Sequence, residues 1–382
     1  MKILHTVQRY YPDSGGSEEV VRKLSECLAE WGHDVTVATS HTSERKELLL
    51  NGVTIKEFDL AGNSVDGIRG DSSEFVNFIR TGEFDIIMNY AAQIWSTDIV
   101  FPELRSLRAK KVLVPCGYSQ LRNPRFGGYF SSLPDILRQY DSLVYLSPNY
   151  IDTKFGEDHG LTNGIVIPNA ADEQEFLNAQ KNEFRKVRGI GNRTLIINVS
   201  NHSNLKGHEF FWNCIGTFDQ GKIASALIGN SYFTGPKKWL KECYTECKIT
   251  AWKRNGILLE NLPRRDVINA YTDADIFLFG SQVECSPLVM FESFASKTLF
   301  VTTDCGNVSD YSDIVCIVRN EKEAVDVIHD FIGNRAKYQA RIEKGYSLFL
   351  EKLNWRAIAK QYEELYASLL HGSHLERRIE SK

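Results

Sequence analysis

The sequence predicts an α/β protein made of two doubly wound domains. Short apolar runs that suit buried parallel strands alternate with stretches of helical periodicity, and this alternation occurs twice along the chain. The 382 residues, of which 42% are hydrophobic, are enough for two domains that each have a core. We therefore expect two successive parallel sheets covered by helices.

The first domain begins with a strand over residues 2–7, an amphipathic helix over 18–31 and a strand over 34–39. This strand–helix–strand order indicates a parallel sheet. The domain is expected to end near Pro168. Its remaining predicted strands are 53–58, 85–89, 111–115, 142–146 and 164–167.

A second set of strands predicts the second domain. After it, residues 354–370 have helical periodicity, with large apolar side chains at Ile358, Tyr362, Leu365 and Leu369. The predicted strands are 194–199, 223–228, 257–259, 275–279, 299–303 and 314–318.

Composition excludes several classes of protein. The net charge of −4 gives no sign of nucleic-acid binding. Cys243 and Cys247 have no second ligand pair at zinc-like spacing, so no metal site is expected and the thiols are taken as reduced. The apolar N-terminal stretch is too short for a signal peptide, and no window approaches the roughly 20 apolar residues of a membrane span. A cytoplasmic protein is expected.

The segment FLFGSQVECSPLVMFESF contains a strand-to-helix turn. Its apolar strand ends at Gly280-Ser281. Ser286 is expected as the N-cap of the following helix, with Pro287 at the first helical position. The free backbone N–H groups of Leu288 and Val289 would then offer a cradle for a phosphate.

Two carboxylates flank this cradle, Glu284 in the turn and Glu292 eight positions later. A carboxylate beside an anion site suits sugar hydroxyls, which can donate hydrogen bonds to it. The alternative is that both acids are solvated. We favour the functional interpretation, because the helix around Glu292 is largely apolar and a buried carboxylate needs a partner. Together these features predict a nucleotide-sugar pocket.

This segment resembles the Glu-x7-Glu motif of retaining glycosyltransferases of family 4, which have the GT-B fold. The resemblance covers nearly the whole chain, and residues 167–176, IPNAADEQEF, resemble the IPNGVD entry to the family's C-terminal domain. It implies two Rossmann-like domains that face each other across a cleft. The expected parts are an acceptor domain at 1–168, a nucleotide-sugar donor domain at 169–353, and a helix and tail at 354–382 that cross back to the first domain.

Two further motifs support the resemblance. Gly15-Gly16 with Glu18 matches a GG-x-E pattern, which in the family lies near the donor diphosphate and the acceptor. Lys206-Gly207 resembles the end of an R-x4-KG segment and makes Lys206 the expected diphosphate cation. The family arginine is replaced by Asn201. His202, Arg264 and Arg265 are left as candidate substitutes.

Other positions of the expected cleft depart from the family pattern or match it loosely. Cys116 stands where the family often has a histidine, and we assign it no nucleophilic role. The loop Asp304-Cys305-Gly306-Asn307, with Asp310, resembles the family's D-x-GG-x-x-E loop and could line the sugar pocket. Asn169 and Asp172 are expected either to lie at the cleft or simply to set the linker turn.

The resemblance implies a metal-independent, retaining transfer of a hexosyl-type sugar from a nucleotide sugar such as a UDP-sugar. Glu284 and Lys206 would be the catalytic residues, and a phosphate oxygen would take the proton. The acceptor would be a glycan, a lipid-linked sugar or a small molecule, in surface polysaccharide or glycoconjugate biosynthesis. The alternatives are an epimerase or phosphorylase on the same fold, and a catalytically weak nucleotide-sugar-binding subunit.

A basic cluster in the first domain is a candidate for peripheral contact with an anionic membrane at its inner face. We favour a solvated helix end instead. The cluster consists of Arg105, Arg108, Lys110 and Lys111.

Overall fold

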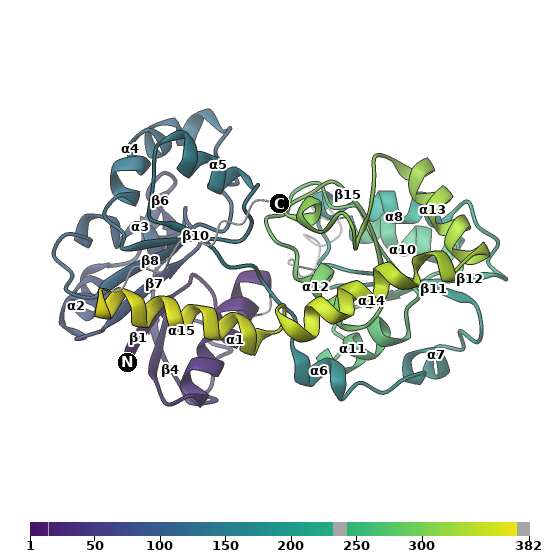
Figure 1. Cartoon of the computed structure of the whole chain (residues 1–382), viewed down its shortest axis with the longest axis horizontal. Helices are drawn as coiled ribbons and strands as arrows, with labels where there is room; N and C mark the ends of the chain where they lie inside the picture. The colour runs from purple at the N-terminus through teal and green to yellow at the C-terminus, as the bar shows by residue number, and fades with distance from the viewer. Residues whose placement is uncertain (14, 232–242, 373–382) are drawn as a thin grey trace. The chain divides into compact units, whose positions relative to one another are not determined.

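A computed structural model describes residues 1–13, 15–231 and 243–372 of the chain (Figure 1). The chain divides into two compact units. The N-terminal unit comprises Met1–Asn169 and Trp355–Lys382, and the C-terminal unit comprises Ala170–Asn354. The polypeptide therefore leaves the first unit, builds the second and returns to the first.

The N-terminal unit contains an eight-stranded sheet of order β10-β9-β8-β7-β1-β2-β4-β3. Its strands are parallel except for β3, which pairs antiparallel with β4. The edge strand β3 and the separate β5-β6 hairpin were not predicted, because they are only two or three residues long. The strands are β1 (Lys2–Thr6), β2 (Asp34–Ser40), β3 (Leu49–Leu50), β4 (Val53–Phe58), β5 (Ala61–Asn63), β6 (Gly67–Arg69), β7 (Ile86–Tyr90), β8 (Lys110–Val114), β9 (Ser142–Tyr145) and β10 (Gly164–Val166).

The first helix of this unit buries one apolar stripe, as amphipathic segments do. In α1, Val20, Val21, Leu24 and Leu28 are buried. The helices are α1 (Gly16–Glu30), α2 (Ser73–Thr81), α3 (Trp95–Asp98), α4 (Gly127–Leu137), α5 (Ile151–Asp158) and α15 (Trp355–His371), with short 3-10 turns η1 (Phe101–Glu103) and η2 (Pro124–Phe126).

The last helix, α15, packs against α1 in the N-terminal unit. The Tyr366 hydroxyl lies 3.2 Å from His5 Nε2 in β1. Glu363 Oε1 lies 2.9 Å from His33 Nε2. These contacts confirm the expectation that the C-terminal helix returns to the first domain.

The C-terminal unit contains a six-stranded sheet of order β13-β12-β11-β14-β15-β16, and all its pairings are parallel. With the mainly parallel first sheet, this confirms the predicted α/β class with two Rossmann-like domains. The strands are β11 (Thr194–Val199), β12 (Ile223–Ile228), β13 (Ile257–Leu259), β14 (Ile276–Phe279), β15 (Leu299–Thr303) and β16 (Cys316–Val318). The helices are α6 (Glu173–Leu177), α7 (Glu183–Val187), α8 (His208–Ile215), α10 (Tyr244–Lys253), α11 (Arg264–Asp273), α12 (Leu288–Ala295), α13 (Glu321–Gly333) and α14 (Ala336–Glu351), with 3-10 turns η3 (Asn204–Lys206) and η4 (Val308–Tyr311).

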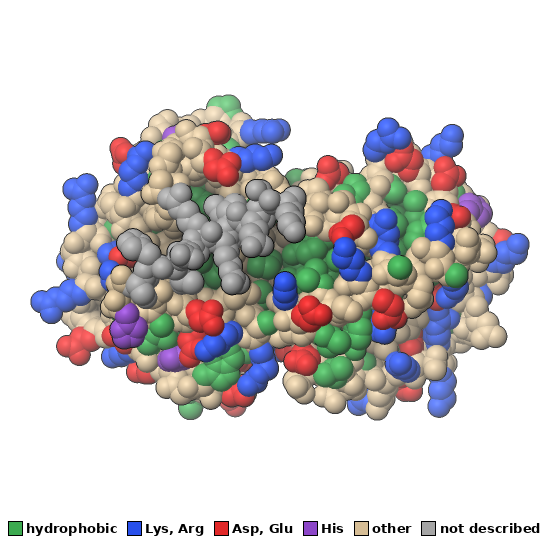
Figure 2. All heavy atoms as spheres, in the orientation of Figure 1, with side chains coloured by type: hydrophobic (Ala, Val, Ile, Leu, Met, Phe, Trp, Pro, Cys, Tyr) green, Lys and Arg blue, Asp and Glu red, His purple; other side chains and the backbone are tan. Residues whose placement is uncertain are grey.

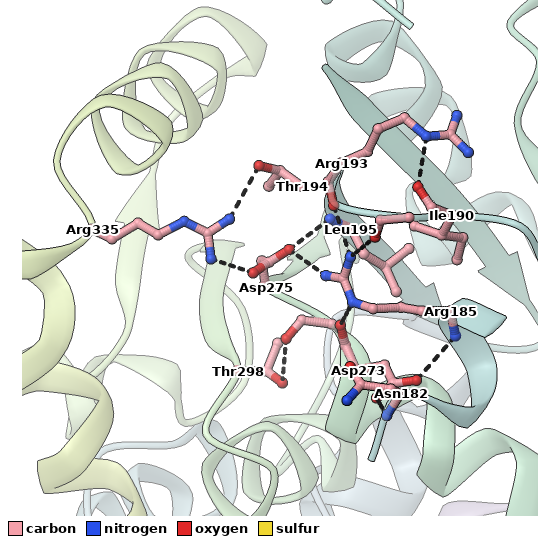
Figure 3. Close-up of polar contacts among 12 residues, drawn as sticks. Asn182, Arg185, Ile190, Arg193, Thr194, Leu195, Asp273, Asp275, Thr298 and Arg335 are labelled. Atoms are coloured by element: carbon pink, nitrogen blue, oxygen red, sulfur yellow. Dashed lines mark hydrogen bonds and ion pairs between the residues drawn. The ribbon is translucent and has the colours of Figure 1, made fainter. Parts of the chain in front are cut away.

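Asp275 connects the amino ends of the central strands of this sheet through hydrogen bonds and ion pairs (Figure 3). Its Oδ2 accepts hydrogen bonds from Arg185 Nη2 at 2.6 Å and from the Leu195 backbone N–H at 2.7 Å. Arg335 binds its other oxygen. Because both sides of this carboxylate are held by guanidinium groups, the network is structural, and it leaves the opposite, carboxyl ends of the strands for a ligand.

Lys, Arg, Asp and Glu side chains are interspersed on the face drawn in Figure 2. The predicted basic cluster follows this pattern, since Lys110 and Lys111 pair with Asp141 at 3.3 Å and 3.2 Å. The interpretation as a helix end fits only part of the cluster, because Arg105 lies in the turn after the 3-10 helix at Phe101–Glu103, whereas Lys110 and Lys111 begin β8. Within the described ranges, no helix combines the length and apolar content needed to cross a membrane.

Candidate functional site

Three loops meet at the carboxyl ends of β11, β14 and β15, which are neighbours in the second sheet. The Gln282 N–H donates to the Leu205 carbonyl at 2.9 Å, which joins the loops after β14 and β11. The Thr303 hydroxyl donates to the Ser281 carbonyl at 2.9 Å, which joins the loops after β15 and β14. Ligands of open parallel sheets bind at this edge, so these loops form the candidate site.

Two glycines allow the loops to approach this closely. Gly207 has a φ of +65°, and a Cβ there would lie 1.9 Å from the Gly280 carbonyl oxygen. Gly306 has a φ of +59°, and its Cβ would lie 2.7 Å from the Cys285 carbonyl oxygen. A side chain would push the loops apart at either position, so glycine is a geometric requirement here.

Lys206 and Glu284 form the charged centre of the site. Lys206 ends the 3-10 turn η3, and its Nζ lies 2.7 Å from Glu284 Oε1. The Ser281 hydroxyl donates to the same carboxylate oxygen at 2.8 Å. The Lys206 side chain is 28% exposed and that of Glu284 is 13% exposed. A ligand can therefore reach both groups, which are already positioned by their neighbours.

Glu292 lies in α12 and is bound by Arg264, the first residue of α11. The Glu292 side chain is 9% exposed and the Arg264 side chain 42% exposed. Arg264 also donates to Glu175 Oε2 at 2.8 Å. Of the two arginines considered as substitutes for the family arginine, Arg264 therefore contacts Glu292 of the Glu-x7-Glu motif. Arg265 instead donates a hydrogen bond to Gln180 Oε1 at 2.6 Å. The Arg264–Glu292 pair was not predicted, since 28 residues separate its members.

The start of α12 differs from the prediction. The helix begins at Leu288, and its N-cap is Pro287 without a side-chain capping bond, so the assignment of Ser286 as N-cap is wrong. The physical reason is that the Ser286 hydroxyl accepts a hydrogen bond from Asn307 Nδ2 at 3.1 Å. Leu288 and Val289 remain the first two helical residues, whose N–H groups precede the intrahelical hydrogen bonds.

The loop after β15 lies against this turn. Gly306 and Asn307 contact it as described above, and Asp304 is exposed at its start. The structure therefore places the predicted Asp304 to Asn307 loop beside Glu284 and Ser286.

The structure corrects the expectation for His202. Its side chain is fully buried, so it cannot supply a cation to a bound diphosphate. Its Nδ1 lies 3.7 Å from Cys243 Sγ instead. The Asn201 side chain accepts a hydrogen bond from the Asn230 N–H at 3.2 Å and joins the loops after β11 and β12.

The site residues predicted in the N-terminal unit lie at the ends of helices and strands of that unit. Gly15 is the N-cap of α1 in extended conformation, and a Cβ there would lie 2.4 Å from Glu18 Oε2. Glu18 is buried and pairs with Arg9 at 2.8 Å. Gly15 thus makes room for a carboxylate that folds back over the helix start, while a Cβ on Gly16 would meet nothing within 4 Å.

Cys116 follows β8 with a φ of +59°, which is unusual for a residue with a side chain. Its Sγ lies 3.9 Å from the Tyr90 hydroxyl. Asn169 is buried and is the last residue of the unit before the chain crosses to Ala170. Asp172 is the N-cap of α6, since its Oδ1 accepts a hydrogen bond from the Glu175 N–H at 2.9 Å.

Comparisons with known proteins agree with these features. Residues 180–348 match the family described as glycosyl transferases group 1. No curated protein matches the chain in sequence. Solved structures share the fold over nearly its whole length. Sucrose-phosphate synthase from Thermosynechococcus elongatus superposes with a TM-score of 0.78 at 15% sequence identity. The alignment covers 97% of this chain and 100% of the synthase chain.

Two more structures show the same fold. Anabaena HepE in complex with UDP superposes with a TM-score of 0.76 at 15% sequence identity, and the alignment covers 96% of this chain and 100% of the HepE chain. WaaG, a glycosyltransferase involved in lipopolysaccharide biosynthesis, has a TM-score of 0.67 at 12% identity, covering 95% and 99%. Residues 180–348 thus match the group 1 glycosyl transferases, and the whole chain shares the GT-B fold of these structures.

Proposed function

We propose that this protein transfers a hexosyl-type sugar from a nucleoside diphosphate sugar to a hydroxyl acceptor with retention of configuration. The observation that carries the proposal is the Lys206–Glu284 pair, 2.7 Å apart and partly exposed at the carboxyl edge of the second sheet. An ammonium matches a diphosphate, and a carboxylate matches sugar hydroxyls. The two ends of one donor molecule are thus complementary to adjacent side chains.

In this proposal Lys206 stabilises the charge that develops on the leaving diphosphate. The Leu288 and Val289 N–H groups at the start of α12 bind phosphate oxygens, with the helix dipole favouring an anion there. Glu292 accepts hydrogen bonds from the ribose hydroxyls, and Glu284 from the donor sugar. Ser286, Pro287, Asp304 and Gly306 shape the wall of the pocket.

The transfer step needs no metal and no side-chain base. The acceptor oxygen forms a bond to the anomeric carbon as the bond from that carbon to the diphosphate oxygen breaks. The acceptor proton passes to a phosphate oxygen. The work of the protein is then to hold the reactants and to stabilise charge, which Glu284 and Lys206 are placed to do.

The N-terminal unit, taken as a domain over 1–168, would bind the acceptor, and the domain over 169–353 the donor. Gly15 and Gly16 are kept as proposed donor-binding residues, and Cys116 and Asn169 as further candidate residues of the site. HepE structures hold UDP and UDP-glucose, which makes UDP-sugars the first donors to test. The role of WaaG in lipopolysaccharide biosynthesis supports a surface polysaccharide or glycoconjugate as the product.

A screen of donors tests the proposal. Thermal-shift measurements with UDP-, GDP-, dTDP- and ADP-sugars should raise the unfolding temperature with one nucleotide class, since a ligand that binds the native state stabilises it. With that donor, sugar release or transfer should follow, and Glu292→Gln should abolish the thermal shift. The matched control is Glu343→Gln, whose carboxylate pairs with Lys297 on the surface. Stabilisation by no donor would contradict the proposal.

A catalytically weak binding subunit remains the second candidate. The observation that favours it is Asn201, which stands where the family has an arginine and whose side chain is bonded to the Asn230 N–H. Donor binding without hydrolysis or transfer over a broad acceptor panel would support this candidate. Turnover that is lost in Glu284→Gln would exclude it.

A further inference from the structure

Four buried side chains with metal-binding atoms converge beside the site. They are His202, His208, Cys243 and Cys247, and their ligand atoms all lie within 4.8 Å of one another. His202 follows β11, His208 begins α8, and the two thiols lie just before α10 and one turn inside it. The expectation that the thiol pair lacks a second ligand pair is wrong, because the fold supplies two histidines from a distant segment.

The distances within this cluster fit a tetrahedral metal. His208 Nδ1 lies 3.1 Å from Cys243 Sγ and 3.6 Å from Cys247 Sγ. His202 Nδ1 lies 3.7 Å from Cys243 Sγ. A zinc ion with Zn–N bonds of about 2.1 Å and Zn–S bonds of about 2.3 Å requires N···S separations of roughly 3.6 Å. The ligand atoms therefore need little movement to enclose one ion.

A chain of hydrogen bonds sets the tautomer of His208. The Asn198 amide nitrogen donates to the Leu278 carbonyl at 2.8 Å, which turns its Oδ1 towards Ser200. The Ser200 hydroxyl donates to that oxygen at 2.7 Å, so it can only accept from His208 Nε2, 2.9 Å away. The His208 proton is then on Nε2, and the lone pair of Nδ1 points at the two thiols. A hydrogen bond that orients the second ring nitrogen is typical of metal-ligating histidines.

Charge also favours a divalent cation in this cluster. His202 is fully buried, and the other three side chains are at most 9% exposed. A buried thiolate or imidazolium without a partner is costly. Two thiolates and two neutral imidazoles around a divalent ion form a neutral unit instead. The spacing also fits, with five residues between the histidines and three between the cysteines.

We propose that His202, His208, Cys243 and Cys247 bind one structural Zn²⁺ ion. Mixed thiolate and imidazole ligands in tetrahedral arrangement select zinc among common divalent metals. Four protein ligands leave no open position, so the ion has no part in the transfer step. It instead clamps the segment between the two histidines, which contains η3 and Lys206. This inference goes beyond the proposed function and does not depend on it.

Metal content of the purified full chain tests the proposal. After gel filtration in zinc-free buffer, mass spectrometry should find about one zinc per chain. Cys247→Ser and His202→Ala should each lose most of it. The matched control is Cys27→Ser, which changes a cysteine of α1 in the N-terminal unit and should leave the zinc content unchanged. Zinc well below one per chain in protein prepared with added Zn²⁺, or equal zinc in all variants, would overturn the proposal.

Two measurements on the unaltered chain guard against variants that fail to fold. Protein loaded with Co²⁺ should show the visible bands of a tetrahedral ion and a thiolate charge-transfer band in the near ultraviolet. Titration with an organomercurial should release zinc to a colorimetric chelator as the thiols react. Octahedral Co²⁺ bands, or zinc release that does not follow thiol modification, would contradict ligation by Cys243 and Cys247.

Discussion

Lys206 Nζ and Glu284 Oε1 lie 2.7 Å apart, although 78 residues separate them in the chain. They meet because β11 and β14 are adjacent and the loops after these strands are hydrogen-bonded to each other. Each charge offsets the other before a ligand arrives. A nucleotide sugar can then replace the pair by giving the ammonium a diphosphate and the carboxylate a hydroxyl.

Replacing Lys206 by Met should lower kcat by about 10²–10³, since the cation acts on charge that develops as the diphosphate leaves. Steady-state kinetics with the donor found in the screen measure this. The control is Lys297→Met, which removes a lysine that pairs with Glu343 at the surface after α12 and should leave kcat unchanged. Equal rates for Lys206→Met and the unaltered protein would contradict the role given to Lys206.

Arg264→Gln should weaken donor binding about tenfold, roughly 1.4 kcal/mol. The reason is that Arg264 holds the Glu292 carboxylate, which is proposed to bind the ribose. Calorimetric titration with the nucleoside diphosphate gives the dissociation constant. Arg265→Gln is the matched control, because the neighbouring guanidinium contacts Gln180. Tighter binding by Arg264→Gln would show that this arginine competes with the donor for Glu292.

The sequence was enough to predict both sheets, because long apolar strands separated by amphipathic helices carry their own periodicity. β11, β12 and β15 have the predicted bounds. The short β3 and the β5-β6 hairpin lack such a pattern. Helix starts were less predictable, as Ser286 shows: its hydroxyl bonds Asn307 from a loop that no local rule could place.

The same limit applies to side-chain clusters. The spacing of the two histidines and of the two cysteines was visible, yet each pair alone is a weak signal. Only the packing of α8 and α10 near the end of β11 brings His208 within 3.6 Å of Cys247. Looking for a histidine pair as well as a thiol pair at zinc-like spacing would have found the cluster.

Gly207→Ala should destabilise the protein by about 3 kcal/mol or more, since it combines a left-handed φ with a collision against backbone. The added Cβ would lie 1.9 Å from the Gly280 carbonyl oxygen. Gly191→Ala is the control, with a φ of +62° but nothing within 4 Å of its Cβ, and should cost only about 1 kcal/mol. Urea unfolding compares the two. If both variants lose the same free energy of unfolding, then the loop that contains Gly207 and Lys206 can move away from Gly280 without a cost.

Stability should fall when the pH drops below about 6.5, and His5 is one cause. Burial lowers the pKa of the His5 imidazole from 6.5 to about 3. In the unfolded chain this imidazole is therefore protonated below about pH 6.5, whereas in the folded chain it is protonated only below about pH 3. Between these pH values the unfolded state binds more protons than the folded state. Stability is complete above pH 6.5 and declines below it, by about 2 kcal/mol between pH 7 and pH 5 from this group.

His5→Gln should flatten this part of the pH dependence, because the amide cannot take up the proton. It should also lower stability at pH 7, since His5 contacts Ser25 at 2.8 Å and Tyr366 at 3.2 Å. Urea unfolding at pH 7, 6 and 5 separates the two effects. His329→Gln is the control, because that imidazole is exposed on α13 and lies against Phe218. If His5→Gln keeps the full slope between pH 6.5 and 5, then His5 is protonated in the folded protein and other groups produce the acid sensitivity.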